Sequence, residues 1–303
     1  MNLTWYGLAL CSAVFLGFYD LAKKAAVRNN AIPAVLFWSV VSGALPWLPF
    51  VLWSKLAPET LPLHALRVAP LSLPEHALLF LKSFIAGSSW AFAYAALKHL
   101  PLSVAAPIRA TSPLWTILVA TLCFGERPNP RQWLGIAVIL GSFYAFTWVS
   151  QREGIDFRRN RHVGLMLVAT LLASASALYD KYLLQRLRLD VATVQAWFSI
   201  YLVAVTLPWF LHWRAVPANR RSPFEWRRSI PAIGLLLLVT DFLYFSAVHR
   251  PDAMISLVSP LRRTSVLVSL IAGVHLFRER QLWSKILCVT GLLAGVFLLS
   301  RLN

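Results

Sequence analysis

Two arginines stand in the middle of apolar runs of this chain, each in nearly the same surroundings. Residues 103–127 read SVAAPIRATSPLWTILVATLCFGER and residues 256–280 read SLVSPLRRTSVLVSLIAGVHLFRER, and the two lines agree at 9 of 25 positions. Unrelated segments of this length would agree at about two positions. Arg109 and Arg262 are among the shared residues. The arginine therefore belongs to a repeated unit and is not an accident of one helix.

The chemistry offered by this repeated line is the binding of an anion. A guanidinium carries a planar fork of N–H donors that matches a carboxylate or a phosphate bidentately. A proline two residues before each arginine frees a backbone carbonyl and bends the helix, and hydroxyl residues follow directly. Aromatic residues on neighbouring spans are expected to face the same cavity. The predicted substrate-binding residues are Arg109, Arg262, Arg263, Ser112, Ser265, Tyr19, Tyr179 and Trp90.

Ionisable residues elsewhere in the apolar runs are predicted to act as counter-ions or coupling groups, namely Asp20, Asp180, Asp241, Lys24 and Lys181. A charged group at membrane depth costs at least about 2.5–3.5 kcal/mol, so it is rare unless it is paired or faces water. Two alternatives stay open. In one, Asp20 and Asp180 only pair with Arg109 and Arg262 and lock helices together. In the other, the arginines act as a gate by exchanging partners. Lys23 and Lys82 are expected to extend to the membrane surface.

Composition decides which elements position these residues. Apolar residues make up 58% of the 303 and charged residues only 14%, whereas soluble domains carry about 25% charged residues. A span needs about 20 apolar residues. The sequence therefore predicts an all-α polytopic membrane protein with ten transmembrane helices, at residues 3–22, 31–53, 77–98, 102–124, 131–150, 163–184, 190–213, 229–249, 252–276 and 281–300.

The repeat divides these spans into two halves of five. Tyr19-Asp20 near the end of the first span matches Tyr179-Asp180 near the end of the sixth. Five crossings are an odd number, so the second half begins on the opposite side and the halves are inverted copies, as in many secondary transporters. We expect a first repeat over residues 1–150, a basic linker over 151–162 and a second repeat over 163–303.

The five-plus-five spans, the FGER and FRER turns and the glycine-containing span after each turn resemble the drug/metabolite transporter (DMT) superfamily, EamA-like branch. Arg278 replaces the glycine of the turn in the second half. The resemblance implies a ten-helix, multi-pass protein of the bacterial inner (plasma) membrane that moves small metabolites by alternating access. It leaves the substrate open among sugars, amino acids, nucleotide-sugars, cations and lipid-linked groups.

The leading interpretation is a secondary membrane transporter for a small metabolite with an anionic carboxylate or phosphate group. A flippase for a lipid-linked anionic headgroup is the alternative within the same fold, and a membrane scaffold or intramembrane enzyme is the alternative from another class. The sequence contains no Walker loop and no catalytic or metal-binding motif, so no enzyme activity, cofactor or metal is predicted.

The formal net charge of +17 is expected to face the anionic headgroups of the bilayer and not nucleic acid. The Lys/Arg distribution predicts that the connections after the odd-numbered spans are cytoplasmic, whereas the family resemblance implies the opposite orientation. Gly291 and Gly295 permit close helix approach, in a homodimer or within the chain.

Overall fold

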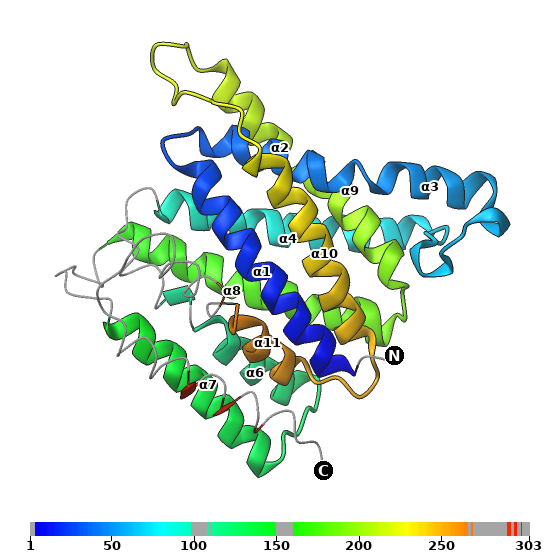
Figure 1. The fold of residues 1–303 in the computed structure, drawn as a ribbon, viewed down its shortest axis with the longest axis vertical. Coiled ribbons are helices and arrows are strands. Elements are labelled where there is room, and N and C mark those ends of the chain that lie inside the picture. Colours follow the sequence, from blue (N-terminus) through cyan, green and yellow to red (C-terminus); the bar gives the residue numbers. More distant parts are fainter. Residues whose placement is uncertain are drawn as a thin grey trace.

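The computed structural model describes residues 4–97, 108–109, 111–149 and 160–265, together with residues 268, 290, 291, 294, 295 and 298. Throughout these ranges the regular structure is helical, without a strand (Figure 1). Helices of sufficient length and apolarity to cross a membrane are Trp5–Val27, Ile32–Leu56, Leu73–Ala96, Arg161–Arg186, Val191–Ala215 and Ser229–His249. The predicted all-helical, multi-pass membrane architecture is thus confirmed, while the number ten stays a prediction.

The first half of the chain forms α1 (Trp5–Val27), α2 (Ile32–Ala44), α3 (Trp47–Leu56), α4 (Leu73–Leu97), α6 (Ser112–Cys123) and α7 (Pro130–Val149). The predicted span 31–53 is divided between α2 and α3, which are separated at Leu45 and Pro46. Two short 3-10 helices, Pro58–Thr60 and His64–Leu66, lie in the connection before α4.

Helix α4 begins four residues before the predicted start at 77, and its first residues explain why. Ser72 and Glu75 form a capping pair, in which the Glu75 carboxylate accepts from the Ser72 amide at 2.7 Å and from its hydroxyl at 2.6 Å. Pro74 stands in the first turn, where its missing N–H costs nothing. The earlier start places every later residue of α4 deeper in the membrane than the hydropathy pattern indicated.

The second half forms α8 (Arg161–Lys181), the π-helical turn η3 (Tyr182–Arg186), α9 (Val191–Ala215), α10 (Ser229–His249) and α11 (Ile255–Arg263). Asn160 begins α8, since its side chain accepts from the amide of His162 at 2.9 Å. The predicted spans 102–124 and 252–276 are described only in part, and most of 281–300 and of the linker 151–162 lies outside the described residues, as do Pro107 and Arg278.

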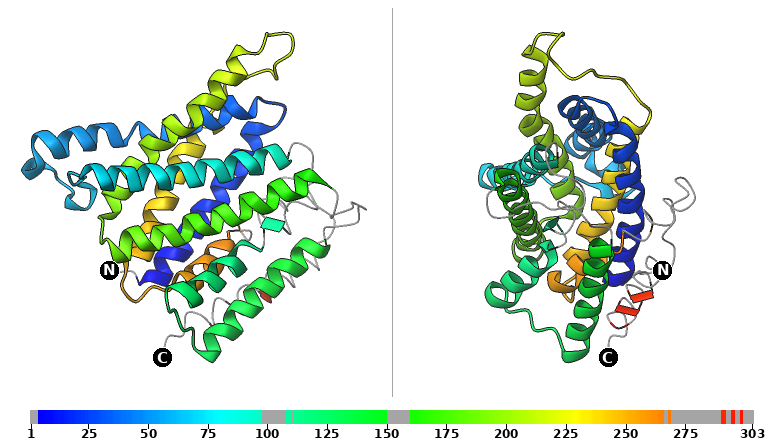
Figure 2. Two further views of the ribbon diagram at one scale, coloured as in Figure 1. Left: turned by 180° about the vertical axis from the view of Figure 1, so that it is seen from behind. Right: turned by 90° about the vertical axis from the view of Figure 1, so that its left-hand side faces the viewer.

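Helix pairing follows the repeat. Each of the main contacts between two helices has a counterpart when every helix is replaced by its equivalent in the other half. The pair α1 and α10 corresponds to α8 and α4, and the pair α1 and α11 corresponds to α8 and α6. The pair α2 and α10 corresponds to α9 and α4. Two further pairs with extensive contact, α2 with α9 and α6 with α11, each join equivalent helices of the two halves. Exchanging the halves therefore leaves the pattern of these main contacts unchanged, and the contacts join the helices in the ring α1–α10–α2–α9–α4–α8–α6–α11. Figures 1 and 2 show these helices from three sides.

Glycine allows two of the closest helix contacts. A methyl group on Gly234 of α10 would lie 2.2 Å from the carbonyl oxygen of Ser39 in α2. One on Gly295 would lie 2.5 Å from Cγ1 of Ile139 in α7. The glycine face of residues 291 and 295 thus packs within the chain, one of the two arrangements that its sequence allows.

Candidate functional site

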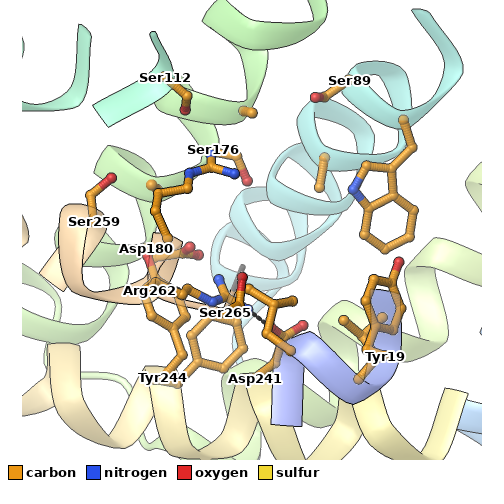
Figure 3. A pocket seen from close by; sticks show the side chains of 18 of the residues that line it. Tyr19, Ser89, Ser112, Ser176, Asp180, Asp241, Tyr244, Ser259, Arg262 and Ser265 are labelled. Carbon is orange, nitrogen blue, oxygen red and sulfur yellow. Dashed lines mark hydrogen bonds and ion pairs between the residues drawn. The ribbon is translucent and has the colours of Figure 1, made fainter. Parts of the chain in front are cut away.

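A cavity of about 370 Å³ lies inside the ring, between α1, α4, α6, α8, α10 and α11 (Figure 3). Sites for small molecules commonly have volumes of about 300–1,000 Å³. Most of the residues that the sequence indicated for a site converge on this cavity from both halves of the chain. They are Tyr19, Asp20, Trp90, Arg109, Ser112, Asp180, Asp241, Arg262, Arg263 and Ser265.

Three of the indicated residues are not part of the described cavity wall. Tyr179 packs against the apolar core, with its ring stacked on Tyr182 at 5.8 Å between centroids. Lys181, one residue beyond Asp180, forms an ion pair with Glu126. The helical backbone of Lys24 belongs to α1, and its side chain lies outside the described part of the chain.

The acid at the end of α8 is neutralised by a lysine from α4. Lys82 Nζ lies 2.6 Å from Asp180 Oδ1, and both side chains are only 4% exposed. Lys82 also donates to the carbonyl of Ser176 at 3.1 Å. Two buried charges are tolerated at this distance because each offsets the desolvation of the other. This pair joins helices from the two halves of the protein.

The expectation that Lys82 extends to the membrane surface is wrong. Lys82 lies nine residues after Leu73, the first residue of α4, which is about 14 Å at about 1.5 Å per residue. In a helix that crosses a hydrocarbon core about 30 Å thick, this position is expected near the middle, and Lys82 is 3% exposed and paired with Asp180. The late predicted start of the helix is the source of the error.

A second ion pair of the cavity joins Arg262 of α11 to Asp241 of α10. Arg262 Nη2 lies 2.5 Å from Asp241 Oδ1, and the guanidinium carbon lies 4.2 Å from the centroid of the Tyr244 ring. Figure 3 shows these three side chains grouped beside Asp180. The alternative in which Asp180 pairs with Arg262 is therefore not what the structure contains, because Lys82 neutralises Asp180 and Arg262 is paired with the acid of α10.

The other charged groups of the cavity form no ion pair within the described part of the chain. They are Asp20 and Lys23 from α1, Arg109 before α6 and Arg263 at the end of α11. Lys23 Nζ lies 4.8 Å from the centroid of the Tyr94 ring and 5.5 Å from that of Tyr19. The pairing of Asp20 with Arg109, the other half of the structural alternative, is likewise not found among these ion pairs.

The charge of the described cavity wall is positive. Five basic and three acidic side chains line it, so that two positive charges remain after formal cancellation. Three of the basic groups, Lys23, Arg109 and Arg263, share the single acid Asp20. Charges in a site of reduced dielectric constant require compensation from water or from a ligand of opposite sign.

The hydroxyl groups divide into structural and open ones. Ser89 donates to the carbonyl of Ala169 at 2.7 Å, and Ser112 lies 3.1 Å from the hydroxyl of Ser174, so both join helices of the ring. In the described structure the hydroxyls of Ser259 and Ser265 form no hydrogen bond and line the cavity. They are the donors available to a ligand beside the arginines.

Candidate metal ligands are not gathered anywhere in the described ranges, which hold no group of three or more His, Cys, Asp or Glu side chains suited to a metal ion. The site is built instead from guanidinium, ammonium, carboxylate and hydroxyl groups. Lys23 and Lys82 are the charged members of the site that the sequence did not lead us to include. Each is an ionisable residue within an apolar run, which indicates a site residue. Their predicted nearness to span ends indicated instead that they extend to the membrane surface.

The fold and the site define a class of protein. It is a helical, multi-pass membrane protein with a charged cavity between equivalent helices of its two halves. A sequence model of the EamA-like transporter family matches residues 3–148 and again residues 161–301. The chain belongs to the EamA-like transporter family, which lies within the DMT superfamily.

Local similarity extends to curated flippase subunits. Over 52 residues the chain is 38% identical to the probable 4-amino-4-deoxy-L-arabinose-phosphoundecaprenol flippase subunits ArnE of Yersinia pestis (strain Pestoides F) and Yersinia pseudotuberculosis serotype O:1b (strain IP 31758). The match covers 17% of this chain and 46% of each relative, and thus a little under half of their length.

The fold has a counterpart among solved structures. A protein crystal structure superposes with a TM-score of 0.70 at 15% sequence identity, covering 98% of this chain and 95% of the other. At this level of identity the likeness concerns the fold alone.

Proposed function

We propose that this transporter moves a small metabolite with an anionic group, a phosphate or a carboxylate, by alternating access between two inverted five-helix repeats. The observation that carries the proposal is the excess of two positive charges around the cavity. Arg109 and Arg263 supply planar, bidentate donors without an acid of their own, while Ser259 and Ser265 supply hydroxyls. An anionic substrate provides the compensation that this wall lacks.

Asp20 is proposed as the coupling group. It is the cavity carboxylate without an ion pair in the described structure, whereas Asp180 and Asp241 are held as counter-ions by Lys82 and Arg262. A carboxylate near three cations competes with a substrate anion for the same donors. Its protonation or displacement would therefore be linked to substrate binding.

The test is a thermal-unfolding screen of the purified protein against inorganic phosphate, a phosphate monoester, acetate, a neutral sugar and an organic cation. Anions should raise the unfolding temperature, because they bind the native cavity and not the unfolded chain. Arg109→Met should abolish that rise. Arg67→Met removes an exposed arginine of the α3–α4 connection and serves as the matched control. A response restricted to the cation would overturn the proposal.

Flipping of a lipid-linked anionic headgroup is the second candidate, favoured by the 52-residue similarity to the flippase subunits. The same arginines would then hold a headgroup phosphate while the lipid chain stays in the bilayer. The two candidates separate in proteoliposomes. Uptake of a water-soluble anion supports metabolite transport, whereas translocation of a labelled polyprenyl phosphate without such uptake supports the flippase.

A further inference from the structure

Glu126 lies in the turn between α6 and α7, yet its carboxylate is buried. Gly125 adopts a φ of +67° after the end of α6, a conformation that glycine adopts without steric cost. The following amide, that of Glu126, donates back to the carbonyl of Ala120 at 3.2 Å. This reversal directs the side chain inward, where Glu126 is 7% exposed.

Both oxygens of this carboxylate hold the start of α11. Oε1 accepts from the amide of Ile255 at 2.8 Å, and Oε2 accepts from the amide of Ser256 at 2.9 Å. The residue before the helix, Met254, provides no side-chain cap. The first amides of a helix are unsatisfied and carry partial positive charge, so a carboxylate there is stabilising. Glu126 thus caps a helix of the other repeat.

Lys181 completes this arrangement from α8. Its ammonium group pairs with Glu126 Oε1 and is 11% exposed. The carboxylate therefore joins the α6–α7 turn, the end of α8 and the start of α11. Four residues beyond Lys181, the side-chain amide of Gln185 donates to the backbone carbonyl of Val248, in α10, at 2.7 Å. It also donates to the carbonyl of Ala253, after the end of α10, at 3.0 Å.

Apolar side chains fill the space between these polar contacts and the cavity. Leu183 and Leu184 of η3, Val248 of α10 and Ile255 and Leu257 of α11 are each at most 1% exposed and belong to one core cluster. This end of the ring, defined by Glu126, Lys181 and Gln185 and called the Glu126 end, is closed by both kinds of contact.

The capped helix also carries two of the cavity arginines. Seven residues separate Ile255 from Arg262, about 10 Å along the helix axis. Fixing the amino end of α11 therefore sets the position of Arg262 and Arg263 at its carboxyl end. The carboxylate acts on the cavity through the helix, without touching it.

We propose that Glu126 is a latch, a positioning residue that keeps the Glu126 end closed while Arg262 and Arg263 face the cavity. Opening of this end releases the carboxylate from the amides of Ile255 and Ser256 and from Lys181. The inference rests on the proposed alternating-access function, but its test measures closure and needs no substrate. If the proposed transport is wrong but the latch exists, the closure measurement still gives the expected result.

The experiment measures how fast single cysteines react with a charged thiol reagent, in protein from which Cys11, Cys123 and Cys288 have been removed. Two reporters probe the closed end. Ser256→Cys lies beside the latch, and its hydroxyl has no hydrogen-bond partner in the described structure. Leu184→Cys lies on the facing wall. Ser259→Cys, within the cavity, is the third reporter.

Glu126→Gln should raise the reaction rate of both closed-end reporters about tenfold, equivalent to about 1.4 kcal/mol of lost closure. The rate at Ser259→Cys should stay constant or fall. Lys181→Met should give a smaller rise, and it supports the test if Glu126→Gln does not fold. Glu59→Gln, at an exposed position of the α3–α4 connection, is the control and should change nothing.

Three results would overturn the latch. The first is an unchanged rate at both closed-end reporters in folded Glu126→Gln protein. The second is a rise at Ser256→Cys alone, which means fraying of α11 without opening. The third is an equal rise at all three reporters, which means general loosening of the fold. Unchanged rates in Lys181→Met would count against it as well if Glu126→Gln is unfolded.

Discussion

The two ends of the cavity are held by contacts of different kinds. At the Glu126 end, a bidentate carboxylate, a buried ion pair and a close-packed apolar cluster join α6, α8, α10 and α11. At the opposite end, Lys23 of α1 lies over the ring of Tyr94 of α4. A cation–π contact is worth about 0.5–2 kcal/mol, so we expect this contact between α1 and α4 to open at lower cost than the Glu126 end.

Under the proposed alternating access, this difference corresponds to one state of the cycle. The ring of helices is nearly unchanged when the two halves are exchanged, but the contacts that close its two ends are not. An inverted-repeat transporter can adopt a second state in which the ends exchange roles. The proposal therefore predicts the largest rearrangement at the Glu126 end.

Asp20 and Asp180 occupy matching positions of the two repeats, and their contacts also differ. Asp180 is 3% exposed and paired with Lys82, whereas Asp20 has no ion pair among the described residues. The cause lies in their partner helices, since α4 presents the base Lys82 to Asp180, whereas the charged residue that α10 brings to the cavity is an acid, Asp241, and it pairs with Arg262. The equivalent helices α4 and α10 therefore bring charges of opposite sign to the cavity.

The largest effect is expected from breaking the Lys82–Asp180 pair. Lys82→Met leaves a buried carboxylate without its partner, and loss of one member of such a pair costs about 3–5 kcal/mol. The yield of monodisperse protein and its unfolding temperature should fall sharply. The double variant Lys82→Met with Asp180→Asn should recover most of the loss, and Asp20→Asn should remain folded. An equally harmful Asp20→Asn would remove the distinction between the two aspartates.

A smaller but still large effect is expected at Arg262. Arg262→Met leaves Asp241 without its cation, and the arginine is more exposed than Lys82, at 23% of its side chain against 4%. Folding should weaken, and Asp241→Asn in the same chain should restore it. Anion-dependent stabilisation should not return, because the guanidinium is still missing. Return of anion binding in the double variant would show that Arg262 serves only to neutralise Asp241.

The outcomes for these residues show how far sequence reasoning extends. Hydropathy and the repeated arginine line predicted the helical membrane fold and brought Arg109, Arg262 and Asp180 to one cavity, because both depend on local spacing. The partners of the charges depend on which helices of opposite repeats lie side by side and on where α4 begins. Spacing within the FGER turn does not indicate the role of Glu126, since the helix that it caps begins 129 positions away in the chain.

The smallest effect is expected at the weaker end of the cavity. Tyr94→Leu keeps an apolar side chain but removes the ring under Lys23, so the cost of opening should fall by about 0.5–1 kcal/mol. Ser259→Cys should then react about two- to fivefold faster with the thiol reagent, a factor that corresponds to this free energy. Closed-end reporters at Ser256 and Leu184 should keep their rates, because the Glu126 contacts are intact. Tyr144→Leu, at an exposed tyrosine of α7, is the matched control. If Tyr94→Leu leaves the Ser259 reporter unchanged, Lys23 and Tyr94 do not restrict access to the cavity, and the difference between its two ends lies in the latch alone.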